Sequence, residues 1–66
     1  MVSVPSHVNN TLPPVDLFIY VKVEGEFKRV KRKTWATSNH PNHIEVFDEE
    51  DNSYLVKMEK VQWFYP

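Results

Sequence analysis

The chain has 66 residues, with nine acidic and eight basic side chains, one glycine and no cysteine. This length accommodates one small domain. The absence of cysteine excludes a disulfide framework and a zinc site built on thiolates, and a single glycine excludes a glycine-rich phosphate loop. A net charge of −1 argues against a protein that binds nucleic acid by bulk electrostatics.

The first fifteen residues differ from the rest of the chain. Met1–Val15 contains three of the five prolines and shows no sustained apolar period. Proline lacks a backbone donor and biases the preceding residue toward extended conformations, which disfavours a helix. We therefore expect residues 1–15 to form an extended or flexible N-terminal arm, and residues 16–66 to form a single small β domain.

The sequence also gives an expectation about the location of the protein. The N-terminal stretch has neither the basic nor the apolar region of a signal peptide. No apolar run approaches the length of a membrane span, about 18 residues or more. We expect a soluble protein in the cytoplasm, with no membrane contact.

Residues 16–66 alternate apolar and polar side chains with the period of two that is typical of β-strands. Turns are expected at Glu24-Gly25-Glu26, Ser38–Asn42 and Asp48–Asn52. Strands are expected at Asp16–Val23, Phe27–Thr37, His43–Phe47 and Ser53–Tyr65. Opposite parities of Phe27 and Val30 predict a bulge, and a parity change at Glu59-Lys60 predicts a bend. The fold class is therefore all-β: a four-stranded antiparallel meander sheet, which could curl into a small open SH3-like barrel.

The two faces of this predicted sheet have different compositions. One is aliphatic and collects Leu17, Ile19, Val21, Val23, Val30, Ile44, Val46, Val56 and Met58. The other is aromatic and collects Phe18, Tyr20, Trp35, Phe47 and, depending on the bulge, Trp63 or Phe64 and Tyr65. A single sheet with one solvated face does not ordinarily expose so many aromatic rings. Three explanations are open: the sheet curls and buries both faces, the aromatic face binds another protein or a second copy, or it stacks on bases.

A basic run occupies the second predicted strand. It consists of Lys28, Arg29, Lys31, Arg32 and Lys33. Basic residues beside aromatic rings are the combination that single-strand nucleic-acid binders use. The competing interpretation is a solvated edge strand whose lysines prevent aggregation and are partly neutralised across the hairpin by Glu45, Asp48 and Glu49. The acidic turn at Asp48–Asp51 lies close by in the predicted meander, which favours the second interpretation.

The sequence shows no catalytic or metal site. Asp48–Asp51 lacks the spacing and the central glycine of a calcium loop. His40 and His43 lie in or beside a loop, without the third or fourth ligand that zinc requires. No nucleophile is paired with a base. We expect no enzyme activity, no cofactor and no metal.

These observations favour a small non-enzymatic protein-binding module, expected to be a homodimer, whose contact surface is the aromatic face and above all Trp63-Phe64-Tyr65. Short chains without catalytic motifs are often accessory or regulatory proteins, for example phage or mobile-element proteins that bind a host factor; this is an analogy of size. The alternative is a nucleic-acid or nucleotide binder that uses the basic run and its neighbouring aromatics.

Overall fold

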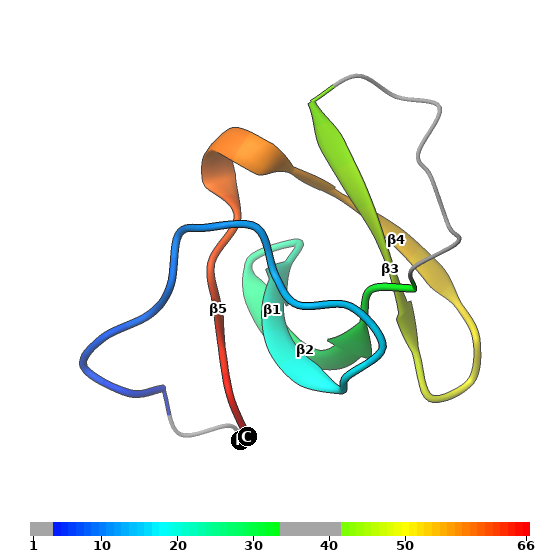
Figure 1. Cartoon of the computed structure of the whole chain (residues 1–66), viewed down its shortest axis with the longest axis horizontal. Helices are drawn as coiled ribbons and strands as arrows, with labels where there is room; N and C mark the ends of the chain where they lie inside the picture. Colours follow the sequence, from blue (N-terminus) through cyan, green and yellow to red (C-terminus); the bar gives the residue numbers. More distant parts are fainter. Residues whose placement is uncertain (1–3, 34–41) are drawn as a thin grey trace.

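The structure, a computed structural model, describes residues 4–33 and 42–66. Within these ranges the chain is all-β, as predicted, and forms one open antiparallel sheet with strand order β4-β3-β2-β1-β5 (Figure 1). Its elements are β1 (Ile19–Val23), β2 (Glu26–Lys31), β3 (His43–Asp48), β4 (Ser53–Lys57), the 3₁₀ turn η1 (Met58–Lys60) and β5 (Trp63–Phe64). No helix in the described ranges has the length and apolar character needed to cross a bilayer.

The last predicted strand is divided in two. The parity change at Glu59-Lys60 is a 3₁₀ turn, after which the chain leaves β4 and pairs with β1 at the far edge of the sheet. There Phe64 lies opposite Tyr20 and Trp63 lies opposite Val21. The sheet therefore has five strands instead of the predicted four. Its two edges are β4 and β5, so closure into a barrel is not confirmed.

The β1–β2 hairpin turns through Glu24 and Gly25, whose φ angles are 51° and 86°. Two consecutive positive φ values are those of a type I′ turn, whose twist matches the flanking strands. The pairing runs without interruption from Val23 opposite Glu26 to Ile19 opposite Val30. The bulge predicted between Phe27 and Val30 is therefore absent, because these two residues simply lie on opposite faces. Strand β2 ends at Lys31, and the predicted continuation to Thr37 falls outside the described residues.

The aliphatic core lies on one face of the sheet, called here the inner face. All the predicted core residues inside strands β1 to β4 are buried: Ile19, Val21, Val23, Val30, Ile44, Val46 and Val56. Leu17 and Met58 were also predicted to be core but are 45% and 44% exposed. Leu17 precedes the first residue of β1, and Met58 lies in η1, which buries none of its residues. Val61 and Trp63 complete the core instead.

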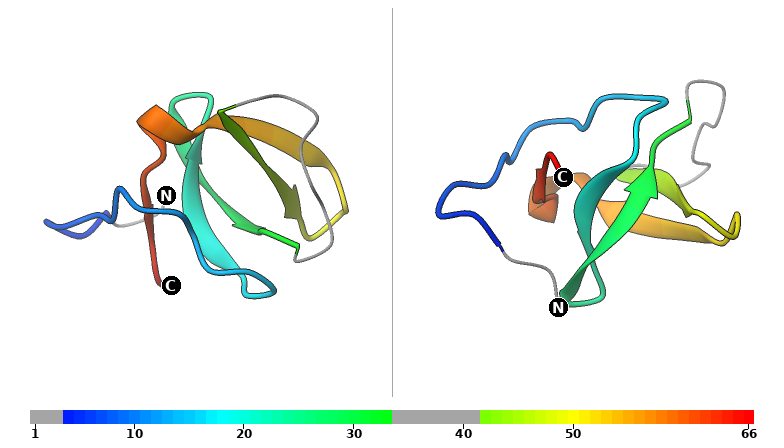
Figure 2. Two further views of the ribbon diagram at one scale, coloured as in Figure 1. Left: turned by 45° about the horizontal axis from the view of Figure 1, so that its top comes forward. Right: turned by 90° about the horizontal axis from the view of Figure 1, so that it is seen from below.

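The described part of the arm, residues 4–15, is extended and contacts the sheet. Asn9 and Trp63 exchange two backbone hydrogen bonds of 2.8 and 3.0 Å, so the arm lies beside β5. Farther along, Val15 forms a parallel bridge with Arg32 at the end of β2. Both views of Figure 2 show the arm, in blue, passing over β5 before it turns into β1. The arm thus covers the outer edge of β5.

The aromatic and basic face of the sheet as a candidate interaction site

The outer face of the sheet gathers aromatic and basic side chains from four strands, because side chains alternate between faces along each strand. Tyr20 of β1 lies between Arg29 of β2 and Phe64 of β5 in the strand pairing. Lys31 of β2 lies opposite Phe47 of β3. The sheet therefore brings part of the predicted aromatic and basic sets together on one face, whereas Lys28 and Trp63, both opposite the buried Val21, lie on the inner face.

Part of this aromatic set packs on itself. The rings of Tyr20 and Phe64 are stacked with centroids 5.2 Å apart, and Phe27 meets Phe64 edge to face at 4.9 Å. These are the offset and edge-to-face arrangements that aromatic quadrupoles favour. Phe64 is only 6% exposed as a result. Three of the outer-face rings thus form a small second cluster, in which Phe64 is buried while Tyr20 and Phe27 stay half-buried.

The C-terminal aromatic cluster, predicted to be the main contact surface, divides among three environments. Trp63 lies on the inner face and is 6% exposed, so it belongs to the core. Phe64 belongs to the outer-face cluster. Tyr65 is 58% exposed, with its ring 5.2 Å from that of Trp63. Trp63 and Phe64 were expected to face a partner, but here they stabilise this chain's own fold; only Tyr65 remains available.

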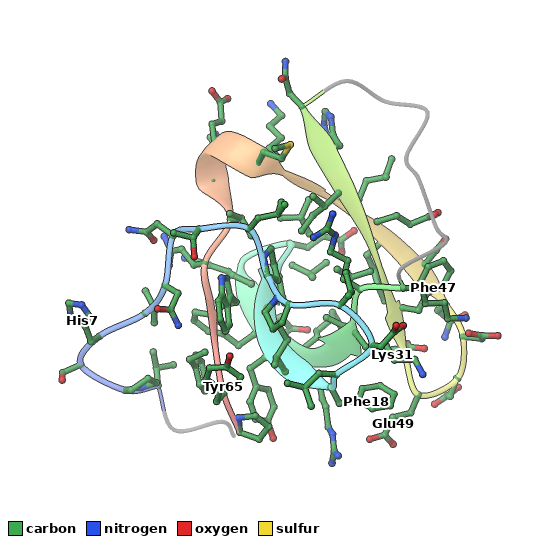
Figure 3. All side chains as sticks on the ribbon, in the orientation of Figure 1. His7, Phe18, Lys31, Phe47, Glu49 and Tyr65 are labelled. Atoms are coloured by element: carbon green, nitrogen blue, oxygen red, sulfur yellow. The ribbon has the colours of Figure 1, made fainter. Side chains whose placement is uncertain are left out.

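Phe18 and Phe47 remain as half-buried rings close to cations. The Arg29 guanidinium lies 5.4 Å and Lys31 Nζ 5.1 Å from the centroid of the Phe18 ring. Lys33 Nζ lies 4.3 Å from the centroid of Phe47. Figure 3 shows Phe18, Lys31 and Glu49 at one end of the sheet, with Tyr65 away from them beside β5. Trp35, the remaining predicted aromatic contact residue, falls outside the described residues.

The basic run carries many internal pairings. Ion pairs join Lys28 to Glu26 at 3.0 Å, Arg29 to Glu49 at 3.4 Å and Lys33 to Asp51 at 2.8 Å. The hydrogen bond and the charge of Glu26 raise the pKa of Lys28. Arg32 is also engaged: its Nη1 donates a hydrogen bond of 3.1 Å to the carbonyl of Pro13. Carboxylates of the same chain thus compensate much of the positive charge, as the second interpretation expected, although among these partners only Glu49 was predicted. The expected edge position is wrong, however, because β2 lies between β1 and β3.

The acidic turn is built around the Asp48 carboxylate. Its Oδ1 accepts hydrogen bonds of 2.9 Å from the backbone N–H groups of Glu50 and Asn52, and its Oδ2 accepts from Asn52 Nδ2 and the Tyr54 hydroxyl at 3.1 Å each. Partial desolvation acts to raise the pKa of Asp48, but these hydrogen bonds outweigh it and lower the pKa. Asp48 therefore organises the β3–β4 turn.

Metal-binding geometry is not found in the part of the chain that the structure describes, where no three His, Cys, Asp or Glu side chains converge. His43 begins β3 and His7 lies at the outer bend of the arm (Figure 3), while His40 falls outside the described residues.

Sequence reasoning missed a cleft of 440 Å³ between the β1–β2 turn and the β4–η1 segment. Its lining residues are Lys22, Val23, Glu24, Gly25, Leu55, Val56, Lys57, Glu59, Lys60 and Gln62. The cleft arises because the chain crosses from β4 to the opposite edge of the sheet. No local pattern in the sequence signals that crossing, and the mixed lysines and glutamates along the cleft indicate no particular ligand.

No protein-family model, curated protein or solved structure matches this chain.

Proposed function

We propose that this chain is a small non-enzymatic protein-binding module, acting as an accessory or regulatory protein, that self-associates through the Phe18–Phe47 patch. The patch consists of Phe18, Arg29, Lys31, Phe47 and Glu49. One observation carries the proposal: Lys31 joins two half-buried rings, since its Nζ lies 5.1 Å from the centroid of Phe18 and its backbone is paired with Phe47. The patch thus combines two half-buried rings with cations beside the Tyr20–Phe64 cluster, in which Phe64 is buried.

The composition of the patch supports a protein partner. Protein interfaces are enriched in aromatic residues and arginine, and the apolar stems of long basic side chains add contact area while their charged ends stay in water.

The charges of the patch support a second copy as that partner. A two-fold interface is formed by the same surface on both subunits, so the surface must complement itself. The patch carries both signs, with Arg29 and Lys31 beside Glu49. A copy rotated by 180° can therefore place each acidic group opposite a basic one, which favours the correct pairing.

Sedimentation velocity across a wide range of protein concentration tests the proposal. The wild-type chain is expected to self-associate, and the double variant Phe18→Ala, Phe47→Ala to weaken association at least roughly 30-fold, because a central aromatic anchor contributes about 2 kcal/mol or more. Tyr65→Ala is the matched control, since Tyr65 is an exposed aromatic outside the patch. A monomeric wild type, or a double variant that associates like wild type, contradicts the proposal.

A nucleic-acid binder is the second candidate, and one contact favours it: two cations lie over the Phe18 ring. The ion pairs of Lys28, Arg29 and Lys33 weigh against it. A fluorescence titration with short single strands at ~50 mM salt, where phosphate contacts are strong, decides between the two. Binding that weakens steeply with added salt would favour the nucleic-acid interpretation; no binding would remove it.

A further inference from the structure

The arm is held in place by hydrogen bonds to two residues of the sheet, Trp63 and Arg32. Trp63 exchanges backbone hydrogen bonds with Asn9, and its indole Nε1 donates a hydrogen bond of 2.9 Å to the carbonyl of Thr11. Arg32 Nη1 donates to the carbonyl of Pro13 at 3.1 Å, and the Arg32 carbonyl accepts from the Asp16 N–H at 2.6 Å. Most of these contacts involve the backbone of the arm.

The side chains of the arm contribute one apolar anchor. Pro13 is buried, whereas Leu12 and Val15 are 48% and 38% exposed. Proline holds the chain extended before binding, which reduces the entropy that is lost when the segment is ordered. Aromatic rings and donors that contact an extended proline-containing segment are features of surfaces that recognise such peptides, and here Trp63 and Arg32 donate to arm carbonyls beside the buried Pro13.

The arm is joined to the sheet by a sharp turn and contributes no described residue to the core cluster. It joins β1 through Asp16, whose φ is 58°, a left-handed conformation that marks a sharp change of direction. The hydrophobic core cluster contains none of the described arm residues, 4–15. The docked arm therefore resembles a tethered ligand that contacts one core residue, Trp63.

We propose that the surface beneath residues 9–15, which includes Trp63 and Arg32, is a binding site for an extended, proline-containing segment of a partner protein, and that residues 9–15 occupy it as a ligand in cis. A partner segment enters by displacing the arm. This inference goes beyond the proposed function, because neither Trp63 nor Arg32 belongs to the Phe18–Phe47 patch. The tether maintains the arm at a high effective concentration, so the wild-type chain binds external segments weakly.

The test uses the full chain with a weakened arm and an intact binding surface at Trp63 and Arg32. Pro13→Gly removes the buried anchor, and Trp35→Phe leaves Trp63 as the only tryptophan. The probe is a synthetic peptide with the sequence of residues 7–15, and the control is the same peptide with both prolines replaced by glycine. Trp63 fluorescence reports occupancy. If Pro13→Gly does not fold, Asn9→Pro serves instead, because it removes the arm's N–H donor to Trp63 while Asn9 itself is exposed.

The peptide is expected to saturate the weakened-arm variant and to bind the wild-type chain at least tenfold more weakly, as the tethered competitor requires. Adding Arg32→Ala to that variant removes one charge-assisted hydrogen bond and is expected to weaken binding about tenfold or more. Adding Phe18→Ala leaves peptide binding unchanged, so failure here and failure of the proposed self-association are distinguishable. A folded weakened-arm variant with no Trp63 response, or an equal response to the glycine peptide, overturns the inference.

Discussion

The hydroxyl of Tyr54 donates a hydrogen bond of 3.1 Å to Oδ2 of Asp48, across the β3–β4 turn. Lys28 Nζ lies 5.6 Å from the centroid of the Tyr54 ring, so the phenol lies between a cation and a carboxylate. The hydrogen bond to Asp48 is the main reason that the pKa of Tyr54 is raised above 10.0. The contact of Lys28 with the Tyr54 ring thus links the acidic turn to strand β2.

Tyr54→Phe is expected to lower the midpoint of urea unfolding at neutral pH. A raised folded-state pKa means that the contribution of Tyr54 is fully present below its ordinary value of 10.0 and is lost as pH rises through the folded value. The difference in stability between wild type and Tyr54→Phe should therefore shrink above about pH 10. Urea titrations of both chains at neutral and alkaline pH measure this difference. A difference that stays constant across that range would contradict this account of the phenol.

Asp48→Asn is expected to remove part of the acid sensitivity of the fold. The lowered pKa of Asp48 means that its contribution is present above the ordinary value of 3.8 and is lost as pH falls through the folded value. Wild type should lose stability below about pH 3.8 more steeply than Asp48→Asn, while the variant should be the less stable chain at neutral pH. Thermal unfolding monitored by circular dichroism at graded pH checks the slope. Glu50→Gln is the control, since Glu50 contributes to the turn through its backbone N–H.

A small change in the core should cost more than a large change just outside it. Ile19 is fully buried, so Ile19→Val, which deletes one methylene, is expected to cost about 0.5–1.5 kcal/mol. Leu17→Ala deletes far more, but Leu17 is 45% exposed, and the expected effect is within about 0.5 kcal/mol. Chemical denaturation of both variants compares them directly. The opposite ranking would restore Leu17 to the core face that the sequence predicts.

The strand pattern and most of the core could be predicted from alternation, because alternation alone determines which side of a strand each residue occupies. The exceptions, Leu17 and Met58, lie just outside β1 and β4, where that rule no longer applies. The path of the last strand could not be predicted. A change in the parity of the apolar residues is equally compatible with a bulge within one strand and with a turn after which the chain pairs at the other edge of the sheet. Which of the two forms depends on which edge strand has unpaired backbone groups.

The candidate site was predictable in part for a related reason. Alternation placed Phe18, Lys31 and Phe47 on one face, and the strand pairing brings them together. It could not show that Trp63 and Phe64 would be covered, because their environment comes from β1, β2 and the arm. The contacts of the arm could not be predicted from the sequence either, because they are made mainly to backbone carbonyls, which every residue carries.

Trp63→Phe is expected to destabilise the fold, which differs from the partner-binding effect that the sequence suggests for Trp63. The substitution removes the indole donor to the Thr11 carbonyl and some buried ring volume, at a cost of about 1–3 kcal/mol. Tyr65→Phe, at an exposed neighbouring ring, should change the free energy of unfolding by less than about 0.5 kcal/mol. Urea denaturation gives both values. Unchanged stability in Trp63→Phe together with weakened self-association would show that Trp63 is a contact residue.

Glu24→Asn is expected to stabilise the β1–β2 hairpin. Glu24 has φ of 51° in a two-residue turn followed by Gly25 at 86°, and asparagine adopts positive φ more readily than glutamate. Asn-Gly is the preferred pair for this turn, so a gain of about 0.5 kcal/mol is expected, in the range of other local optimisations. Gly25→Ala is the converse control. A Cβ at Gly25 would meet no atom within 4 Å, so its expected cost of about 1 kcal/mol comes from the backbone conformation alone. Thermal and urea unfolding of the two variants should give shifts of opposite sign, and a loss of stability in Glu24→Asn would contradict the assignment of the turn.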